Sequence, residues 1–251
     1  MEFGGRIDRE GAVLVADGWV EYPYSQTVFA AWQADINYRS ATLEARDRHG
    51  IWHEIVREFG YPAGMPRQMA LPLGVLPEGT DAIRLSSNME IYWDRIQVVY
   101  EQSTDLRTQI TRPSVARIAR TGFSKRTTSG QRVPDYDYSK RSPYWDVKTH
   151  KGFYTSLGNA LPLVEAADGA LAIIGGGEEI HLEFDEVAEP PEGYRRYFVI
   201  EFRGWAKDMD LYTQHGDTVG PLPMPPDMNN KSLARRNLLH GKYNVRYQEG
   251  F

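Results

Sequence analysis

The sequence predicts an all-β, mainly antiparallel protein: a jelly-roll-like β-sandwich followed by a second β-rich block, with few short helices. Three observations predict this class. Runs of β-branched and aromatic residues alternate with polar residues at period two, as in strands that bury one face. Turn residues separate these runs at spacings of roughly ten residues, which is typical of sandwiches and barrels. A composition with 15 Tyr and 6 Trp also favours strands and binding faces.

The first strand signals lie in residues 11–22 and 41–57. The run 11–22 is apolar and β-branched, and it contains Asp17-Gly18, a pair that indicates a turn or a bulge. Residues 41–57 consist of two alternating runs on either side of His49-Gly50, which predicts a hairpin.

The longest strand-like stretch covers residues 81–100. Its apolar residues follow period two up to position 93 and then continue one residue out of phase. Such a shift predicts a bulge or bend near Asp94-Arg95 that restores the register. The apolar positions are Ile83, Leu85, Met89, Ile91 and Trp93, followed by Ile96, Val98 and Tyr100.

Two further strands are predicted in the second block. One alternates Ile180, Leu182 and Phe184 with polar residues, and the other alternates Phe198, Ile200 and Phe202. The sequence Pro-Pro-Glu-Gly at 190–193 predicts a loop between them. The better helix candidates are short and basic, at residues 114–120 and 231–240.

Charge divides the chain. The net charge is −5, but between positions 106 and 151 eleven Lys/Arg stand against three Asp/Glu, so this stretch carries about +8 and the remainder about −13. A structureless stretch of roughly 40 residues is unusual inside a compact domain, which places a boundary here. We therefore predict a galactose-binding-like jelly roll at 1–104, a basic linker or strap at 105–142, a second β-rich block at 143–222 and a C-terminal tail at 223–251.

Several function classes are excluded by what the sequence lacks. Without cysteine there is no disulfide, zinc-thiolate site, cysteine-ligated iron–sulfur cluster or thiol catalysis. No apolar run approaches the length of a membrane span. Residues 1–10 are polar, so we expect no signal peptide within this chain, which we interpret as a fragment of a longer protein. No cofactor motif is complete: the glycines at 175–177 precede two glutamates instead of the Lys-Ser/Thr of a phosphate loop.

The carboxylates of Glu90 and Asp94, which flank Trp93, are weak catalytic candidates. Glycoside hydrolysis needs two carboxyl groups that face each other across a cleft. The two residues share a face of one strand, but their spacing is not diagnostic and solvent-facing acids are common. We expect this protein not to be an enzyme.

Asp208 and Asp210, with Asp217 downstream, are candidate ligands for a hard cation such as calcium, which prefers oxygen ligands. The spacing is not that of an EF-hand loop. The alternative is an Asx-type turn at the end of a strand. Calcium is the only cofactor that the sequence suggests.

Aromatic residues are the candidate ligand-binding residues, because amphipathic rings suit a sugar or a partner surface. They are Trp19, Tyr22, Tyr24, Tyr92, Trp93 and Trp145. The basic stretch also interleaves aromatics with Arg and Lys, a pattern typical of nucleic-acid binding. Because the rest of the chain is acidic, the simpler interpretation is that the stretch lies on its own acidic body, and we expect no nucleic-acid partner.

Six segments together resemble one family: residues 17–33, 59–66, 88–95, 152–163, 177–184 and 204–223, with the tail 243–246. They are similar to the C-terminal region of large bacterial proteins that carry FG-GAP or tetratricopeptide repeats and ASPIC/UnbV-type segments. The resemblance implies an accessory region of a large, exported, hence extracytoplasmic protein, and implies no catalytic residues. Where such proteins often read Gly-Asp, this chain has Asn159 and Glu178, so no role is carried over to those positions.

The leading functional hypothesis is a non-catalytic recognition or assembly module. It would bind a carbohydrate, a cell-surface protein partner or the remainder of its parent protein. One alternative is a carbohydrate-active hydrolase that uses paired carboxylates. The other is a module that binds polyanions or nucleic acid through the basic stretch 106–151.

Overall fold

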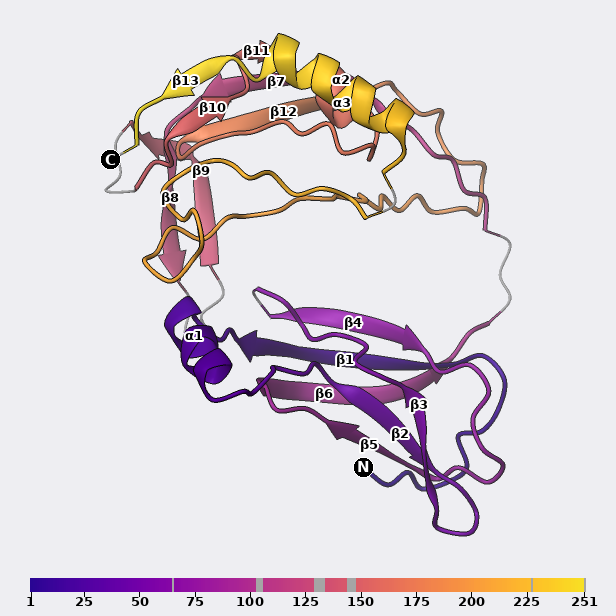
Figure 1. Ribbon diagram of the computed structural model, residues 1–251. Helices are drawn as coiled ribbons and strands as arrows, with labels where there is room; N and C mark the ends of the chain where they lie inside the picture. Colours follow the sequence, from indigo (N-terminus) through magenta and orange to yellow (C-terminus); the bar gives the residue numbers. More distant parts are fainter. Residues whose placement is uncertain (65, 103–105, 129–133, 144–147, 227, 251) are drawn as a thin grey trace. The chain divides into compact units, whose positions relative to one another are not determined.

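The computed structural model describes the chain except for residues 65, 103–105, 129–133, 144–147, 227 and 251 (Figure 1). The chain divides into two compact units. Unit 1 comprises Met1–Leu106 and Thr128–Pro134, and unit 2 comprises Arg107–Thr127 and Asp135–Phe251. Each unit is described by itself below.

Unit 1 contains two antiparallel sheets of three strands each (Figure 1). The first has the order β4-β1-β6, built from β1 (Ala12–Glu21), β4 (Arg67–Pro72) and β6 (Glu90–Tyr100). The second has the order β3-β2-β5, built from β2 (Thr42–Arg46), β3 (Trp52–Val56) and β5 (Ala82–Ser86). All pairings between these strands are antiparallel.

One hydrophobic core joins the two sheets into a sandwich. Leu14 of β1 packs in the same buried cluster as Leu43 of β2 and Ile83 of β5, and each of these side chains is at most 1% exposed. In β2, and in β1 from Leu14 onward, buried residues alternate with residues that point away, which is the period-two pattern of the sequence. The all-β, antiparallel class is therefore confirmed, whereas the jelly-roll arrangement stays a prediction.

The predicted bulge lies where β1 pairs with β6. The register shifts between Asp17 and Gly18, because Asp17 pairs with Arg95 and Gly18 pairs with Trp93. Asp94 is thus the extra residue of a β-bulge. Both expectations, a break at Asp17-Gly18 and a bulge near Asp94-Arg95, are confirmed as one feature seen from its two strands.

The hairpin predicted at 41–57 is confirmed as β2 and β3. Its turn is held by Asp47, whose carboxylate accepts hydrogen bonds from the backbone N–H groups of His49 and Ile51 and pairs with the ring of His53 at 2.8 Å. These bonds, that with His53 first, lower the pKa of Asp47 to about 2. The stretch 81–100 divides into β5 and β6, which belong to different sheets.

A helix that the sequence analysis missed follows β1. Helix α1 (Ser25–Gln33) has no buried residue, and Trp32 is 71% exposed. Its apolar residues are therefore not part of the core of unit 1. Because valine and aromatic residues are common in strands, the sequence of this segment does not indicate a helix.

Unit 2 is built on the sheet β11-β7-β12, formed by β7 (Pro113–Arg120), β11 (Gly158–Asn159) and β12 (Glu178–Phe184). Two pairs complete its strands: β8 (Phe123–Thr128) with β9 (Pro134–Ser142), and β10 (Gly152–Tyr154) with β13 (Arg246–Gln248). The helices are α2 (Leu161–Val164) and α3 (Asn230–Tyr243).

The structure corrects one helix prediction and confirms the other. Residues 114–120 lie in β7, the central strand of its sheet, because Ala116 and Ile118 point inward at period two. Residues 231–240 lie in α3 as predicted, and the helix begins at an N-cap where the Asn229 side chain accepts a hydrogen bond from the Ser232 N–H at 3.0 Å.

Strands β7, β8 and β9 all fall within the basic stretch 105–142. Two of its arginines pair with acids of β12: Arg120 with Glu178 at 3.3 Å, and Arg141 with Glu179 at 2.9 Å. The stretch thus contributes strands to unit 2 and places part of its positive charge against acidic β12.

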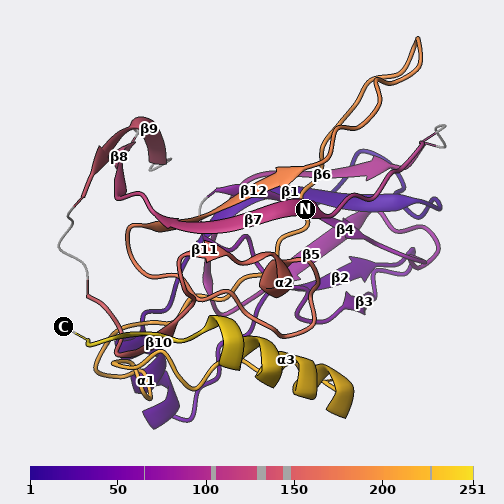
Figure 2. The same ribbon diagram turned by 90° about the horizontal axis from the view of Figure 1, so that it is seen from above.

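The prediction of a strand at 198–202 is wrong. Figure 2 shows the orange chain after β12 extending outward as a narrow loop and returning. Near its tip the Tyr194 N–H bonds to the Pro191 carbonyl, as the loop prediction requires. The returning segment forms no β-ladder with the described residues, so its alternating residues have no core face.

Candidate functional site

The candidate site lies on the side of sheet β4-β1-β6 that points away from the core. On β1, Asp17, Trp19 and Glu21 alternate with the buried residues Ala16, Gly18 and Val20. Their partners across to β6 are Arg95, Tyr92 and Glu90 respectively. Gln68 of β4 lies opposite Asp17. We call this surface the outer aromatic face, formed by Asp17, Trp19, Glu21, Gln68, Glu90, Tyr92 and Arg95.

Two stacked rings form the centre of the outer aromatic face. The ring centroids of Trp19 and Tyr92 are 4.9 Å apart and their planes are inclined by 7°. Tyr92 is 41% exposed and Trp19 is half-buried. The Tyr92 hydroxyl donates to the Glu90 carboxylate on the same strand, which fixes the orientation of the ring. In such a stack each ring keeps one face that its partner ring does not cover.

Charged and amide groups stand beside these rings. The Asp17 carboxylate accepts from Arg95 Nε at 2.8 Å and from Gln68 Nε2 at 3.1 Å, which joins all three strands of the sheet. The bond from Arg95 is the largest of the effects that lower the pKa of Asp17. A guanidinium has five N–H donors and a carboxylate accepts several hydrogen bonds. The row of Gln68, Asp17 and Arg95 can therefore form further hydrogen bonds with a ligand.

The β-bulge and Gly18 position the rings. A Cβ at residue 18 would collide with the Tyr92 carbonyl oxygen and touch the ring of Trp93. Only glycine therefore lets β6 approach β1 closely at this point. Directly after the bulge, Trp19 comes into register with Tyr92.

Of the six predicted aromatic residues, the structure brings together Trp19 and Tyr92. Trp93 pairs with Gly18 and points to the opposite side of the sheet. Tyr22 packs edge-on against Tyr61 at 5.8 Å, and Tyr24 precedes α1 as its exposed N-cap residue. Trp145 lies outside the described residues.

The structure does not bring Glu90 and Asp94 together; the carboxylate that lies opposite Glu90 is that of Glu21. Glu90 and Asp94 lie four residues apart along β6, roughly 13 Å at strand rise, beyond the ~5–9.5 Å that glycoside hydrolysis uses. The direct cross-strand partner of Glu90 is instead Glu21. Sequence reasoning missed Glu21 because its position opposite Glu90 depends on the register of two strands far apart in the chain.

The arginines of β5 and β6 pair with carboxylates of the neighbouring strands. Arg95 bonds to Asp17, and Arg84 forms a bidentate pair with Glu44 at 2.6 Å for both bonds. Asp94 serves as the extra residue of the bulge.

The predicted cation ligands are not assembled into one site. Asp210 accepts hydrogen bonds from the backbone N–H groups of Tyr212 and Thr213 at 2.8 and 2.9 Å, which is the Asx-type turn given above as the alternative. The Asp217 carbonyl accepts from the Lys151 N–H. Within the described part of the chain, Asp208, Asp210 and Asp217 do not form a group of three ligands, and no other such group is found.

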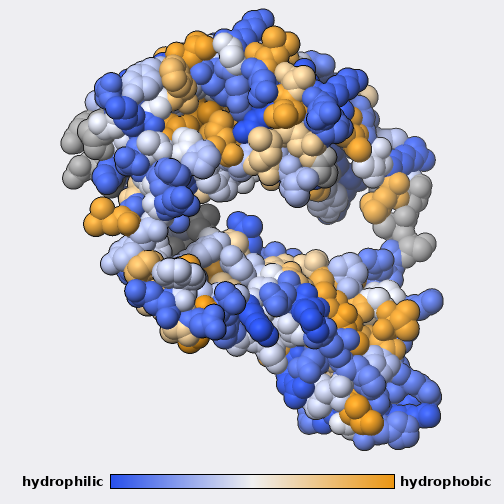
Figure 3. Space-filling model, viewed as in Figure 1, coloured by the Kyte–Doolittle hydropathy of each residue, from blue (hydrophilic) through white to orange (hydrophobic). Residues whose placement is uncertain are grey.

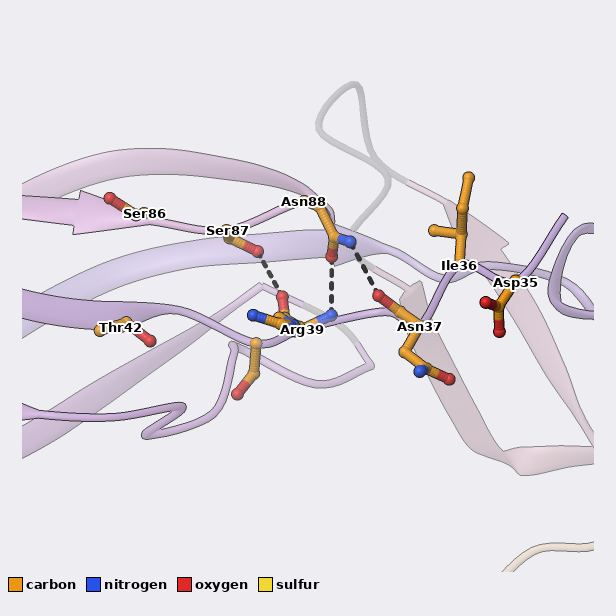
Figure 4. Close-up of a pocket in the computed structure, with 9 residues that line it drawn as sticks. Asp35, Ile36, Asn37, Arg39, Thr42, Ser86, Ser87 and Asn88 are labelled. Atoms are coloured by element: carbon orange, nitrogen blue, oxygen red, sulfur yellow. Dashed lines mark hydrogen bonds between the residues drawn. The ribbon is translucent and has the colours of Figure 1, made fainter. Parts of the chain in front are cut away.

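A polar groove of about 550 Å³ lies beside the loop between β5 and β6. Asn88 links the two segments that line this groove. Its side chain accepts a hydrogen bond from the backbone N–H of Arg39 at 2.6 Å and donates one to the Asn37 carbonyl at 2.9 Å (Figure 4). Ser87 donates to the Arg39 carbonyl at 2.9 Å. Because Asn88 is only two residues from Glu90, roughly 7 Å along the chain, the groove lies close to one end of the outer aromatic face.

A second candidate surface is the ribbon β8–β9 of unit 2. Its shallow groove is lined by Lys125, Arg126, Lys140 and Arg141. Lys140 pairs with Asp137 at 2.8 Å, whereas Lys125 and Arg126 form no ion pair with any residue that the structure describes. On the same ribbon Tyr136 and Tyr138 stack with centroids 6.1 Å apart.

Comparisons of the chain with known protein families, with curated proteins and with solved structures return no match. The family resemblance described above therefore stays a prediction. Among the described residues, no helix is long and apolar enough to cross a membrane.

Proposed function

We propose that unit 1 is a non-catalytic carbohydrate-recognition module of a larger, exported protein. One observation carries the proposal: the stacked pair of Trp19 and Tyr92 on a sheet face that points away from the core, beside carboxylates and a guanidinium. The predicted resemblance to an accessory region favours a larger parent protein.

The chemistry of a sugar ring suits this surface. A pyranose has an apolar C–H face, which packs against an aromatic ring, and hydroxyl groups around its edge. Glu90 and Asp17 supply acceptors for those hydroxyls, while Arg95 and Gln68 supply donors. The polar groove beside Asn88 offers space for further sugar units.

Recognition agrees better with this geometry than hydrolysis. A glycosidase places its two carboxyl groups on either side of the bond that it cleaves. Glu21 and Glu90 instead project from neighbouring strands in the same direction. Such a row can hold hydroxyl groups but does not enclose a glycosidic oxygen.

The test is binding of the whole chain to a panel of soluble neutral polysaccharides by affinity electrophoresis, followed by calorimetry. Trp19→Ala and Tyr92→Ala should each weaken binding at least tenfold. The matched control is Trp205→Ala, because Trp205 is 55% exposed and lies in unit 2. Binding that is unchanged in both variants, or lost equally in the control, would contradict the proposal.

A second candidate function rests on Lys125 and Arg126 of the β8–β9 ribbon: binding of a polyanion. Each phosphate or sulfate contact contributes a steep salt dependence. Lys125→Glu with Arg126→Glu should then lower the salt concentration at which the chain elutes from heparin. Elution at the same salt as the wild type would rule the ribbon out.

A further inference from the structure

The segment Tyr197–Phe198–Val199–Ile200–Glu201–Phe202–Arg203, called here the 197–203 segment, is the most exposed apolar stretch of unit 2. Its five apolar side chains, Tyr197, Phe198, Val199, Ile200 and Phe202, are between 78% and 92% exposed. Surface hydrophobic residues also interrupt the hydrophilic surface elsewhere (Figure 3), but here they follow one another in sequence.

Side chains two residues apart contact each other along the segment, although the segment is not a strand in the structure. Arg203 bonds to the Glu201 carboxylate at 3.1 Å, and the guanidinium of Arg196 lies 5.8 Å from the ring centre of Phe198. Contacts between residues two apart mean that alternate side chains share a side, as in extended chain. In an extended conformation Phe198, Ile200 and Phe202 would share one face.

What the segment lacks is a partner strand. Within the described chain, no backbone group of residues 197–203 bonds to another backbone group. An exposed apolar strand with unpaired N–H and C=O groups is a template for pairing with another chain.

The exposed apolar area marks the segment as an interaction site. Five such side chains, three of them aromatic, present on the order of 700 Å² over the two sides of the segment. Exposed apolar surface of several hundred Å² is typical of a surface that contacts another protein.

We propose that the 197–203 segment pairs antiparallel with the same segment of a second copy of this chain, about a twofold axis at Ile200. In this register Ile200 faces Ile200 of the second copy, and Phe198 faces its Phe202. On the other side of the ribbon Tyr197 faces Arg203, a cation–π pair, and Val199 faces Glu201.

Charge selects this register among the neighbouring symmetric ones. A twofold axis at Val199 would place Arg195 opposite Arg203, and an axis at Glu201 would place two glutamates opposite each other. Like charges directly opposite destabilise an antiparallel pair. Only the axis at Ile200 avoids them among these three and keeps the three apolar residues of one face in contact with their own kind.

The first experiment is sedimentation velocity of the whole chain over a range of concentrations. The wild type should form a dimer, and Ile200→Glu, which places two carboxylates at the axis, should be monomeric. Val75→Glu is the matched control, because Val75 is 92% exposed and lies in unit 1; it should dimerise like the wild type.

A cysteine probe tests the register itself. The natural chain has no cysteine, so Ile200→Cys provides one thiol per copy. Facing residues of an antiparallel pair have Cα atoms ~4.5–5.5 Å apart, which suits a disulfide. Mild oxidation should cross-link Ile200→Cys much faster than Val75→Cys. Equal rates would overturn the proposed register.

Two other outcomes would overturn the dimer. A monomeric wild type whose amides at 197–203 are protected from hydrogen exchange would mean that the segment pairs within its own chain, for example along the outer edge of β12. A monomer with unprotected amides would mean that no second copy binds there.

Discussion

Gly18 is the residue on which the outer aromatic face depends most. Strand β6 passes so close that a Cβ at position 18 would meet the Tyr92 carbonyl. A glycine that weakens most strands is therefore necessary at this one, because it admits the bulge at Asp94. The same contact couples the stability of unit 1 to the position of Tyr92, one of the two stacked rings.

Replacement of Gly18 by Ala should lower the free energy of unfolding of unit 1 by about 1–3 kcal/mol, the usual effect of overpacking. It should also weaken glycan binding, because Tyr92 must move away. Urea unfolding and calorimetry measure the two effects. Gly5→Ala is the control, since a Cβ there meets nothing within 4 Å; equal behaviour of the two variants would refute this account of Gly18.

His240 illustrates a different kind of single-residue dependence. Its Nε2 accepts a hydrogen bond from the Leu171 N–H at 2.9 Å, which requires that nitrogen to be unprotonated. Burial, and then the charge of Arg236, lower the pKa of His240, while Asp168 opposes them. The neutral ring is thus part of the contact between α3 and the loop that carries Leu171.

The stability of unit 2 should therefore fall as the pH drops below about 6.5, the ordinary histidine pKa. The unfolded chain binds a proton there, whereas folded His240 does not until its lower pKa is reached, so acid favours unfolding. His240→Gln, whose amide oxygen can accept the same bond, should reduce the dependence between pH 7 and 5, and the part that remains comes from His150, whose pKa burial also lowers. Denaturation at several pH values tests this. His215→Gln, at an exposed histidine, should leave the slope unchanged.

Among the secondary-structure elements, β1 and α3 each contact segments that are far away in the sequence. Strand β1 lies between β4 and β6 and carries both core residues and the outer aromatic face on alternate positions. Helix α3 buries Leu239 against Leu163, and Asn244 at its end bonds to Thr155 at 2.6 Å. The range 223–251 thus contributes to the core of unit 2.

The 197–203 segment is the element in which sequence and structure disagree most. Its alternation is that of a strand, yet its side chains remain exposed. Pairing between two copies of the chain would give this alternating segment the partner strand that it lacks. It would also join two outer aromatic faces in one assembly, and linked sites on one polysaccharide bind more tightly than either alone.

For the whole molecule, each unit has a hydrophobic core of its own. Leu14→Ala should destabilise unit 1 and Leu239→Ala unit 2, each by about 2–5 kcal/mol, because each leaves a cavity. Calorimetry should therefore show Leu14→Ala and Leu239→Ala shifting different transitions. A single transition shifted equally by both would mean that the two units unfold together.

The strand pattern was readable from the sequence because period-two alternation is local. It predicts β1, the β2–β3 hairpin, β12 and the bulge at Asp94, where the phase of the apolar residues changes. The same logic failed at 114–120, where Ala and Arg favour a helix in isolation but neighbours on both sides make residues 113–120 a central strand. It also failed at α1, whose apolar residues are not buried.

The candidate site needed the tertiary structure. The sequence determined that aromatic and acidic residues are abundant in β1 and β6, and that each strand has two faces. Which of these residues meet was decided by the pairing of strands some 70 residues apart. That register brings Leu14 of β1 and Val98 of β6 to the same core, which no local pattern encodes. It places Trp19 on Tyr92 and Glu21 opposite Glu90, and turns Trp93 to the other side.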